Sequence, residues 1–240
     1  MKHLSLAALL FALPFAAHAQ DAPPPVTYPA VPASAADAKG FVPAGWAIVE
    51  QASGDLDGAG GADLALVVQS RDPANILRAD MCADTLDTNP HILIVALAGP
   101  GGYRRIVANH VLLPRRENAC ALDGLSVLEI KGHSLHLFFE RMMSAGGGDA
   151  GNASFNLQWR GDAMRLIGFD YLNVQRYSGE MKSLSVNFLS RKVKTSVGKT
   201  DSDKQTVRWS RLRPGAVPTL DQVGNNLEYD PQGLVRRLVG

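Results

Sequence analysis

The sequence contains little cysteine, and this limits the metal chemistry open to it. Only two cysteines, Cys82 and Cys120, occur among 240 residues. Neither has a partner two or three residues away, so the spacing of a zinc knuckle is missing. In an oxidising compartment an even pair most often forms a disulfide, and a reactive or metal-binding thiol is the alternative. Such a bridge would stabilise the fold by about 4 kcal/mol.

The chain also lacks an excess of charge of either sign. The chain carries 24 basic and 23 acidic residues, which gives a formal net charge of +1. A net charge near zero argues against a broad electrostatic attraction to nucleic acid or to an anionic membrane. Beyond the amino terminus no apolar run is long enough for a membrane helix. We therefore expect no nucleic-acid partner and no transmembrane segment in the mature chain.

The one long apolar run lies at the amino terminus. Lys2 and His3 precede small apolar residues from 4 to 17, and the triplet Ala17-His18-Ala19 fits the A-x-A cleavage rule. A run of this length is too short to span a bilayer stably, and an ordinary buried helix is the alternative. The pattern predicts a signal peptide over residues 1–19, cleaved after Ala19, and a protein that is periplasmic or secreted.

Residues 20–40 are rich in proline and alanine and show no amphipathic period. Such a composition lacks the apolar surface that would offset the entropy of ordering it. We expect a flexible arm here, sensitive to proteases, whose deletion leaves the melting temperature nearly unchanged. Residues 41–240 are then expected to form a single β-rich domain.

In this part of the chain the apolar residues recur at every second position, as they do in strands. Between residues 154 and 160 they alternate with polar ones, and the pair Gly161-Asp162 that follows favours a two-residue turn. The expected hairpin pairs Trp159 with Met164, Leu157 with Leu166 and Phe155 with Gly168.

Further hairpins show the same pattern. Strands at 125–130 and 135–139 are expected to meet across Gly132-His133, and strands at 183–188 and 193–197 across Ser190-Arg191. The second hairpin would pair Phe188 with Val193, Val186 with Thr195 and Leu184 with Val197. Its solvent-facing side would carry Ser185, Asn187, Lys192 and Lys194.

Other strands are expected at residues 64–68, 92–97, 103–110 and 206–211, with short helices at 75–80 and after Thr219. Many short strands separated by turns predict an all-β fold of antiparallel sheets, as a sandwich or propeller-like arrangement, with about ten short strands and little helix. The segment GDLDGAGGADLALV occurs once, so a complete multi-bladed propeller, which would repeat it, is not expected.

This segment also carries the strongest candidate site. Asp55, Asp57 and Asp63 supply clustered carboxylates, and glycines at 58, 60 and 61 let the backbone fold tightly around them. Calcium prefers several oxygen ligands around one point. The pattern therefore predicts a calcium loop, and a metal-free polar turn is the alternative. An EF-hand is excluded because its twelfth position would be Leu66, which offers no side-chain oxygen.

The spacing D-x-D-x-A-G-x-x-D over residues 55–63 resembles the calcium loop of FG-GAP or VCBS-type repeats, which have D-x-D-x-D-G-x-x-D between two strands of a blade. The resemblance implies an FG-GAP-like loop at 54–63 in which Asp55, Asp57 and Asp63 are side-chain ligands and Gly61 adds its carbonyl. Ala59 stands where the family has Asp or Asn. One ligand is therefore missing, and the affinity for calcium should be reduced.

A wider resemblance covers roughly residues 41–212. It rests on Gly45-Trp46, the aspartate loop, residues 166–168 (LIG) and residues 185–189 (SVNFL). In this order they look like a family of secreted bacterial proteins that carry a single such loop. The resemblance implies a single compact β domain and says nothing about activity.

Motifs of catalysis and nucleotide binding are weak. No G-x-S-x-G pattern occurs, and the S-x-x-K match Ser196 to Lys199 ends a strand where serine acyl enzymes start a helix. The glycine run at 58–61 has Asp63 at the third fingerprint position, so it does not match a Rossmann loop. His91, His110, His133 and His136 are best explained as surface or turn residues. We identify no catalytic and no cofactor-binding residue.

The sequence thus predicts an exported bacterial β-domain with a degenerate structural calcium loop. Its expected role is that of a non-catalytic binding or envelope-associated module, which includes an inhibitor or immunity role. The expected partner is an envelope or extracellular protein or a glycan. The alternative is an extracytoplasmic hydrolase with a site assembled from distant strands. A deep cleft with convergent acids or a perturbed histidine would favour that alternative.

Overall fold

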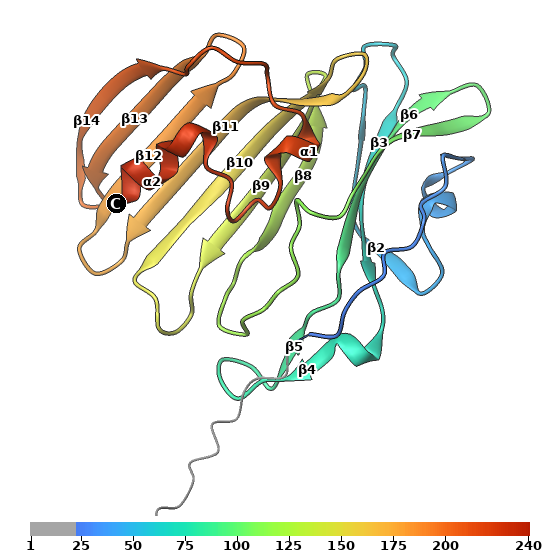
Figure 1. Cartoon of the computed structure of the whole chain (residues 1–240), viewed down its shortest axis with the longest axis horizontal. Coiled ribbons are helices and arrows are strands. Elements are labelled where there is room, and N and C mark those ends of the chain that lie inside the picture. The colour runs from blue at the N-terminus through green and yellow to red at the C-terminus, as the bar shows by residue number, and fades with distance from the viewer. Residues whose placement is uncertain (1–22) are drawn as a thin grey trace, which may run out of the picture.

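The computed structural model describes residues 23–240, and the expected signal peptide lies outside the described residues. The described chain consists mainly of two antiparallel sheets with little helix (Figure 1). This confirms the all-β prediction and gives a sandwich-like arrangement. In the described part of the chain, no helix combines the length and the apolar character needed to cross a membrane.

The first sheet has five strands in the order β1-β7-β6-β3-β2. Its central strands are almost completely buried because both faces of the sheet are covered. This explains their continuous apolar sequences, LALVV and ILIVAL. The strands are β1 (Ser34–Ala35), β2 (Trp46–Gly54), β3 (Asp63–Ser70), β6 (His91–Gly99) and β7 (Gly102–Asn109).

The second sheet has seven strands in the order β14-β13-β12-β11-β10-β9-β8, so that each strand pairs with its neighbours in sequence. The β2 and β3 strands of the first sheet contact β8 at one edge. The strands are β8 (Gly124–Lys131), β9 (Ser134–Met142), β10 (Asp149–Trp159), β11 (Met164–Gln175), β12 (Glu180–Asn187), β13 (Lys192–Lys199) and β14 (Ser202–Arg211).

Short elements complete the fold. The expected helix at 75–80 is wrong, because β4 (Ile76–Arg78) pairs there with β5 (Thr85–Asp87) after the 3-10 turn η2 (Pro73–Asn75). The helix expected after Thr219 is confirmed as α1 (Leu220–Val223), followed by η3 (Pro231–Gly233) and α2 (Leu234–Val239). Figure 1 shows this carboxyl-terminal segment lying across one face of the seven-stranded sheet.

The hairpin at Gly132-His133 is confirmed: Ile130 lies opposite Leu135 next to the turn, and a bulge shifts the register between Leu125 and Val127. Both turn residues have positive φ, 56° and 57°, as a two-residue hairpin turn of the primed type requires. The hairpin at Gly161-Asp162 is confirmed near its turn. Beyond the turn a bulge adds one residue to β11, so Phe155 lies opposite Phe169 and not Gly168.

The register expected for the β12–β13 hairpin is wrong by two residues. Val186, and not Phe188, lies opposite Val193. The cause is a turn of four residues, 188–191, in which Arg191 has a φ of 56° and Asn187 accepts a hydrogen bond from the Ser190 N–H. A shift of two leaves the alternation of the two faces unchanged, but Val197, which was expected on the core face, is 38% exposed. The predicted solvent-facing residues Ser185, Asn187, Lys192 and Lys194 are accordingly exposed.

The main hydrophobic core lies between the two sheets and under the carboxyl-terminal segment. Phe155 and Phe169 pack at its centre, with Tyr229 from the tail 5.7 and 5.0 Å from their ring centroids. Burial raises the pKa of the Tyr229 phenol, because the charged form would lose its hydration. The tail is therefore part of the core.

A second core explains the amino-terminal segment and corrects the expectation of a flexible arm over its described part, residues 23–40. The strand β1 pairs with β7, and η1 (Ala38–Phe41) follows it. Tyr28 and Val31 pack with the fully buried Phe41 on the outer face of the first sheet. The composition of this segment is that of a linker, but the apolar face it covers orders it.

Candidate functional site

The aspartate loop connects β2 to β3, and its carboxylates converge. One carboxylate oxygen from each of Asp55, Asp57 and Asp63 lies within 4.8 Å of the others. Asp63 is buried at 1% exposure, whereas Asp57 is exposed. Oxygen ligands at this spacing could hold a metal ion. The sequence-predicted residues are thus brought together, and the role expected of the Gly61 carbonyl remains a prediction.

Hydrogen bonds within the loop hold the carboxylates in place. Asp63 accepts from the N–H groups of Leu56 at 2.7 Å, Asp57 at 3.3 Å and Ala98 at 2.7 Å. These three donors compensate the burial of its charge. Asp55 and Asp57 each accept one backbone N–H through Oδ1, so that their Oδ2 atoms accept no hydrogen bond from the described backbone.

The loop also contacts the second sheet through a residue that the sequence did not assign to it. His133, in the β8–β9 turn, places Nδ1 3.0 Å from the Asp55 carbonyl and 3.6 Å from its Oδ2. The expectation of a turn histidine is confirmed, but its contact with the loop had no local signal in the sequence.

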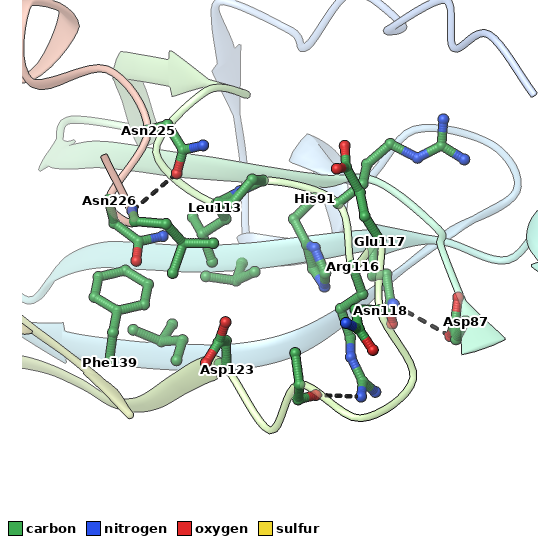
Figure 2. Close-up of a pocket in the computed structure, with 18 of the residues that line it drawn as sticks. Asp87, His91, Leu113, Arg116, Glu117, Asn118, Asp123, Phe139, Asn225 and Asn226 are labelled. Atoms are coloured by element: carbon green, nitrogen blue, oxygen red, sulfur yellow. Dashed lines mark hydrogen bonds between the residues drawn. The ribbon is translucent and has the colours of Figure 1, made fainter. Parts of the chain in front are cut away.

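A cleft of about 600 Å³ lies between the two sheets, and the connection from β7 to β8 forms part of its wall (Figure 2). Residues from six separate parts of the chain line it. Its apolar wall consists of Val49, Val67, Leu113, Leu125 and Phe139. A cavity of this size, with an apolar wall and a polar rim, is typical of a small-molecule site.

The rim of the cleft is acidic. Five carboxylates line it against two guanidinium groups, those of Arg115 and Arg116. Asp123 already accepts from the Met142 N–H, and Arg116 donates to the Ala121 carbonyl. The carboxylates belong to Glu50, Asp87, Glu117, Asp123 and Glu228. The local charge therefore favours a cation.

His91 lies inside this cleft and not on the surface, which corrects the expectation for this histidine. Figure 2 shows its imidazole in the middle of the cleft, between Asn226 at one end and Asp87 at the other. Burial lowers its pKa, while the negative charge of Asp87 partly opposes that shift. Burial therefore favours the neutral form of the ring. Its buried Nδ1 has no hydrogen-bond partner among the described residues.

Asn226 presents a second unpaired polar atom to the cleft. Its side chain is part of a residue only 4% exposed, and its Nδ2 donates to the Leu112 carbonyl at 2.6 Å. Its Oδ1 is buried and has no partner among the described residues. An unsatisfied acceptor in a buried position costs about 1–3 kcal/mol, which a ligand N–H or O–H would recover.

Arg115 and the disulfide fix the wall of the cleft. The guanidinium of Arg115 donates to the Thr88 carbonyl, the Pro24 carbonyl and the Asn75 Oδ1, at 2.6, 2.6 and 2.8 Å. It thus joins the amino-terminal segment, the β4–β5 region and the β7–β8 connection. Nothing in the local sequence around Arg115 marks this role.

The disulfide is present as predicted. Cys82 and Cys120 are joined with a Cα–Cα distance of 5.1 Å. The bridge links the β4–β5 turn to the β7–β8 connection, beside a small cluster of Ala79, Leu86 and Ala119. Both cysteines are therefore structural, and the alternative of a reactive thiol is wrong.

Comparisons with known proteins identify no relative. No protein-family model matches the chain, and neither the curated proteins nor the solved structures contain a significant match. The function has to be inferred from the aspartate loop, the cleft and the surface.

Proposed function

We propose that this protein is an exported, non-catalytic binding module whose ligand occupies the cleft between the two sheets. The observation that carries the proposal is the unpaired Oδ1 of Asn226, which lies in a cavity of about 600 Å³ that has an apolar wall and an acidic rim. A buried acceptor without a partner is costly, and it is retained where a bound donor satisfies it. A cell-envelope role follows from the expected signal peptide and agrees with the disulfide, which suits an oxidising compartment.

The ligand is a small organic cation with an apolar portion. The excess of carboxylates on the rim attracts positive charge, and the neutral His91 adds none. The wall formed by Leu113, Leu125 and Phe139 suits a hydrocarbon or aromatic group. A protonated amine with an apolar portion fits the carboxylates of the rim, the neutral His91 and the apolar wall. The basic side chain of a partner protein has the same chemistry.

One observation favours the second candidate, a hydrolase. His91 has a perturbed pKa and lies in a cleft with carboxylates from distant strands. A general base, however, needs a partner that orients its ring. The Nδ1 of His91 has none in the described chain, and Asp87 accepts from Gln69 and from the Asn89 N–H. Binding is therefore the better account of the cleft.

Titration with benzylamine and cadaverine should test the cleft. These amines are expected to shift the NMR resonances of Asn226 and Leu125, while benzoate and glutarate, which are anions, should leave them unchanged. Leu125→Trp fills the apolar wall and should weaken amine binding by at least about tenfold. Val127→Trp, on the same strand at a residue 44% exposed, is the matched control and should bind normally.

Equal binding by Leu125→Trp, or equal affinity for the carboxylates, would contradict the cationic cleft. Turnover of chromogenic esters, phosphates or glycosides that disappears in His91→Gln would support the hydrolase in its place.

The aspartate loop serves a structural role in the same proposal, as a weak calcium site. Its ligand atoms are all oxygens, which suits calcium, and the Oδ2 atoms of Asp55 and Asp57 accept no hydrogen bond from the described backbone. The loop lies between β2 and β3 and contacts the β8–β9 turn through His133. A bound ion would therefore strengthen the junction between the two sheets and would take no part in ligand binding.

Calcium should raise the melting temperature, because an ion that binds only the folded state stabilises it. At ten times the dissociation constant the gain is about 1.4 kcal/mol, which corresponds to roughly 3–5 °C in a chain of this size. Asp57→Ala should abolish the response. Ala59→Asp supplies the ligand that the family pattern has, and it should enlarge the response at the same calcium concentration.

Ala62→Asp is the matched control, since it adds the same charge to the loop outside the ligand pattern. Calorimetric scans with calcium and with chelator measure each response. If calcium shifts neither the wild type nor Ala59→Asp, the loop is a metal-free turn.

A further inference from the structure

The free edge of the seven-stranded sheet carries an unusual concentration of positive charge. Residues 189–213, which form β13, β14 and their flanks, contain eight basic residues and only two acidic ones, Asp201 and Asp203. The whole chain has a net charge of +1. The near-neutral total therefore hides a segment of net charge +6, balanced by negative charge elsewhere in the chain.

Part of this charge gathers on one face around an exposed tryptophan. In the β13–β14 register Lys194 lies opposite Trp209, and Lys192 lies opposite Arg211. Directly opposite residues of an antiparallel pair share a face. Val207, two residues from Trp209, therefore lies on the same face. We call Lys192, Lys194, Val207, Trp209 and Arg211 the β14 surface.

The β14 surface is open. Every residue of β14 is exposed, and Trp209 and Val207 keep 67% and 43% of their surface accessible. A hollow of about 460 Å³ beside Trp209 is lined by Lys192, Ser210 and Arg211. No ion pair in the described chain involves its three cations. Exposed apolar side chains rimmed by polar residues mark interaction sites.

We propose that the β14 surface docks onto an anionic phospholipid bilayer. Tryptophan is enriched at the level of lipid headgroups, because its ring is apolar and its N–H needs a polar partner. Basic residues next to it gain from the negative surface potential. The hollow between Lys192 and Arg211 can receive a lipid phosphate. The β14 surface has a single aromatic ring, whereas single-stranded nucleic acid is held by several stacked aromatics.

This docking is peripheral and reversible. One inserted ring and three cations give a modest affinity, comparable with that of a single weak anchor. It is also oriented, because β14 is one edge of the seven-stranded sheet and the cleft is lined by β8 and β9 at the other end of the strand order. Docking through β14 therefore leaves the cleft accessible.

Sedimentation with phosphatidylglycerol vesicles tests the proposal with the purified protein. We expect binding to these vesicles, none to phosphatidylcholine vesicles, and a loss of binding at high salt. Each basic residue near an anionic bilayer contributes about a fivefold factor. The variant Lys192→Gln, Lys194→Gln, Arg211→Gln should therefore bind roughly 100-fold more weakly. The matched control removes three exposed cations elsewhere: Arg78→Gln, Lys131→Gln and Arg160→Gln.

Tryptophan fluorescence provides a second readout. The emission should shift to the blue on anionic vesicles, and this shift should vanish in Trp209→Phe, which retains Trp46 and Trp159. Equal losses in the triple variant and its control, or an unchanged shift in Trp209→Phe, would overturn the proposal. So would binding to dextran sulfate or DNA without binding to vesicles. If the protein binds neither the vesicles nor these polyanions, the proposal is wrong, and the basic residues of β13 and β14 serve only to prevent the free edge strand from pairing with another chain.

Discussion

Deletion of residues 23–39 should lower the free energy of unfolding by about 5 kcal/mol, since burial of each large apolar side chain contributes about 1.5–3 kcal/mol. The segment covers the outer face of the first sheet, where Leu66, Val68 and Ile94 are completely buried. Its removal exposes this face to water. It also removes the pairing of β1 with β7 and the Pro24 carbonyl that accepts from Arg115.

Urea denaturation of the purified deletion variant measures this effect. Tyr28→Ala is a gentler form of the test, because Tyr28 stacks on His110 at 4.3 Å and packs near Trp46 at 6.3 Å. It should cost about 2 kcal/mol. Pro29→Ala, in the same segment, is a control for the substitution of a residue by alanine. An unchanged urea midpoint after deletion would restore the view of this segment as a free linker.

The amino-terminal segment is ordered, although the sequence predicts a flexible arm, and this difference has a clear physical reason. Local composition sets the entropy of ordering a segment, and residues 23–40 read as a linker on that basis. Whether they order depends on the apolar face of β3 and β6, which lies far away in the sequence. The continuous apolar sequences of β3 and β6 do indicate that some segment covers the outer face of the sheet, because a strand that is apolar on both faces must be buried on both.

Hairpins could be predicted where the turn itself fixes the register. Gly132-His133 and Gly161-Asp162 are two-residue turns, and the pairs next to them are as expected. The register failed where the chain adds residues, at the bulge in β11 and in the four-residue turn before β13. The alternation of apolar and polar residues predicts which face of the sheet a side chain occupies. It cannot distinguish two strand registers that differ by two residues.

The candidate sites divide in the same way. The aspartate loop is local, so nine consecutive residues were enough to identify Asp55, Asp57 and Asp63. The cleft is assembled from distant segments, and no pattern in the chain joins His91 to Asn226. The β14 surface did have a signal, the run of basic residues at 189–213. This local excess of positive charge is not visible in the net charge of the whole chain, because acidic residues elsewhere balance it.

Removal of the disulfide should lower the free energy of unfolding by about 4 kcal/mol, because the bridge restrains a long loop in the unfolded chain. Cys82 and Cys120 are 38 residues apart, and the loop between them contains β5, β6 and β7. The variant Cys82→Ala with Cys120→Ala should therefore melt roughly 10 °C lower than the wild type. Reduction of the wild-type protein should produce the same shift without a change of sequence.

The bridge should matter for the cleft as well as for the fold. Cys120 lies in the β7–β8 connection that forms one wall, and Arg115 in the same connection is the other tie between this wall and the β4–β5 region. Without the bridge, hydrogen exchange should rise at Leu86 and Ala119, and the cleft should bind amines more weakly, while the backbone amides of β10 and β11 stay protected. A variant with an unchanged midpoint and an unchanged exchange pattern would show that Arg115 and the core hold the wall without the disulfide.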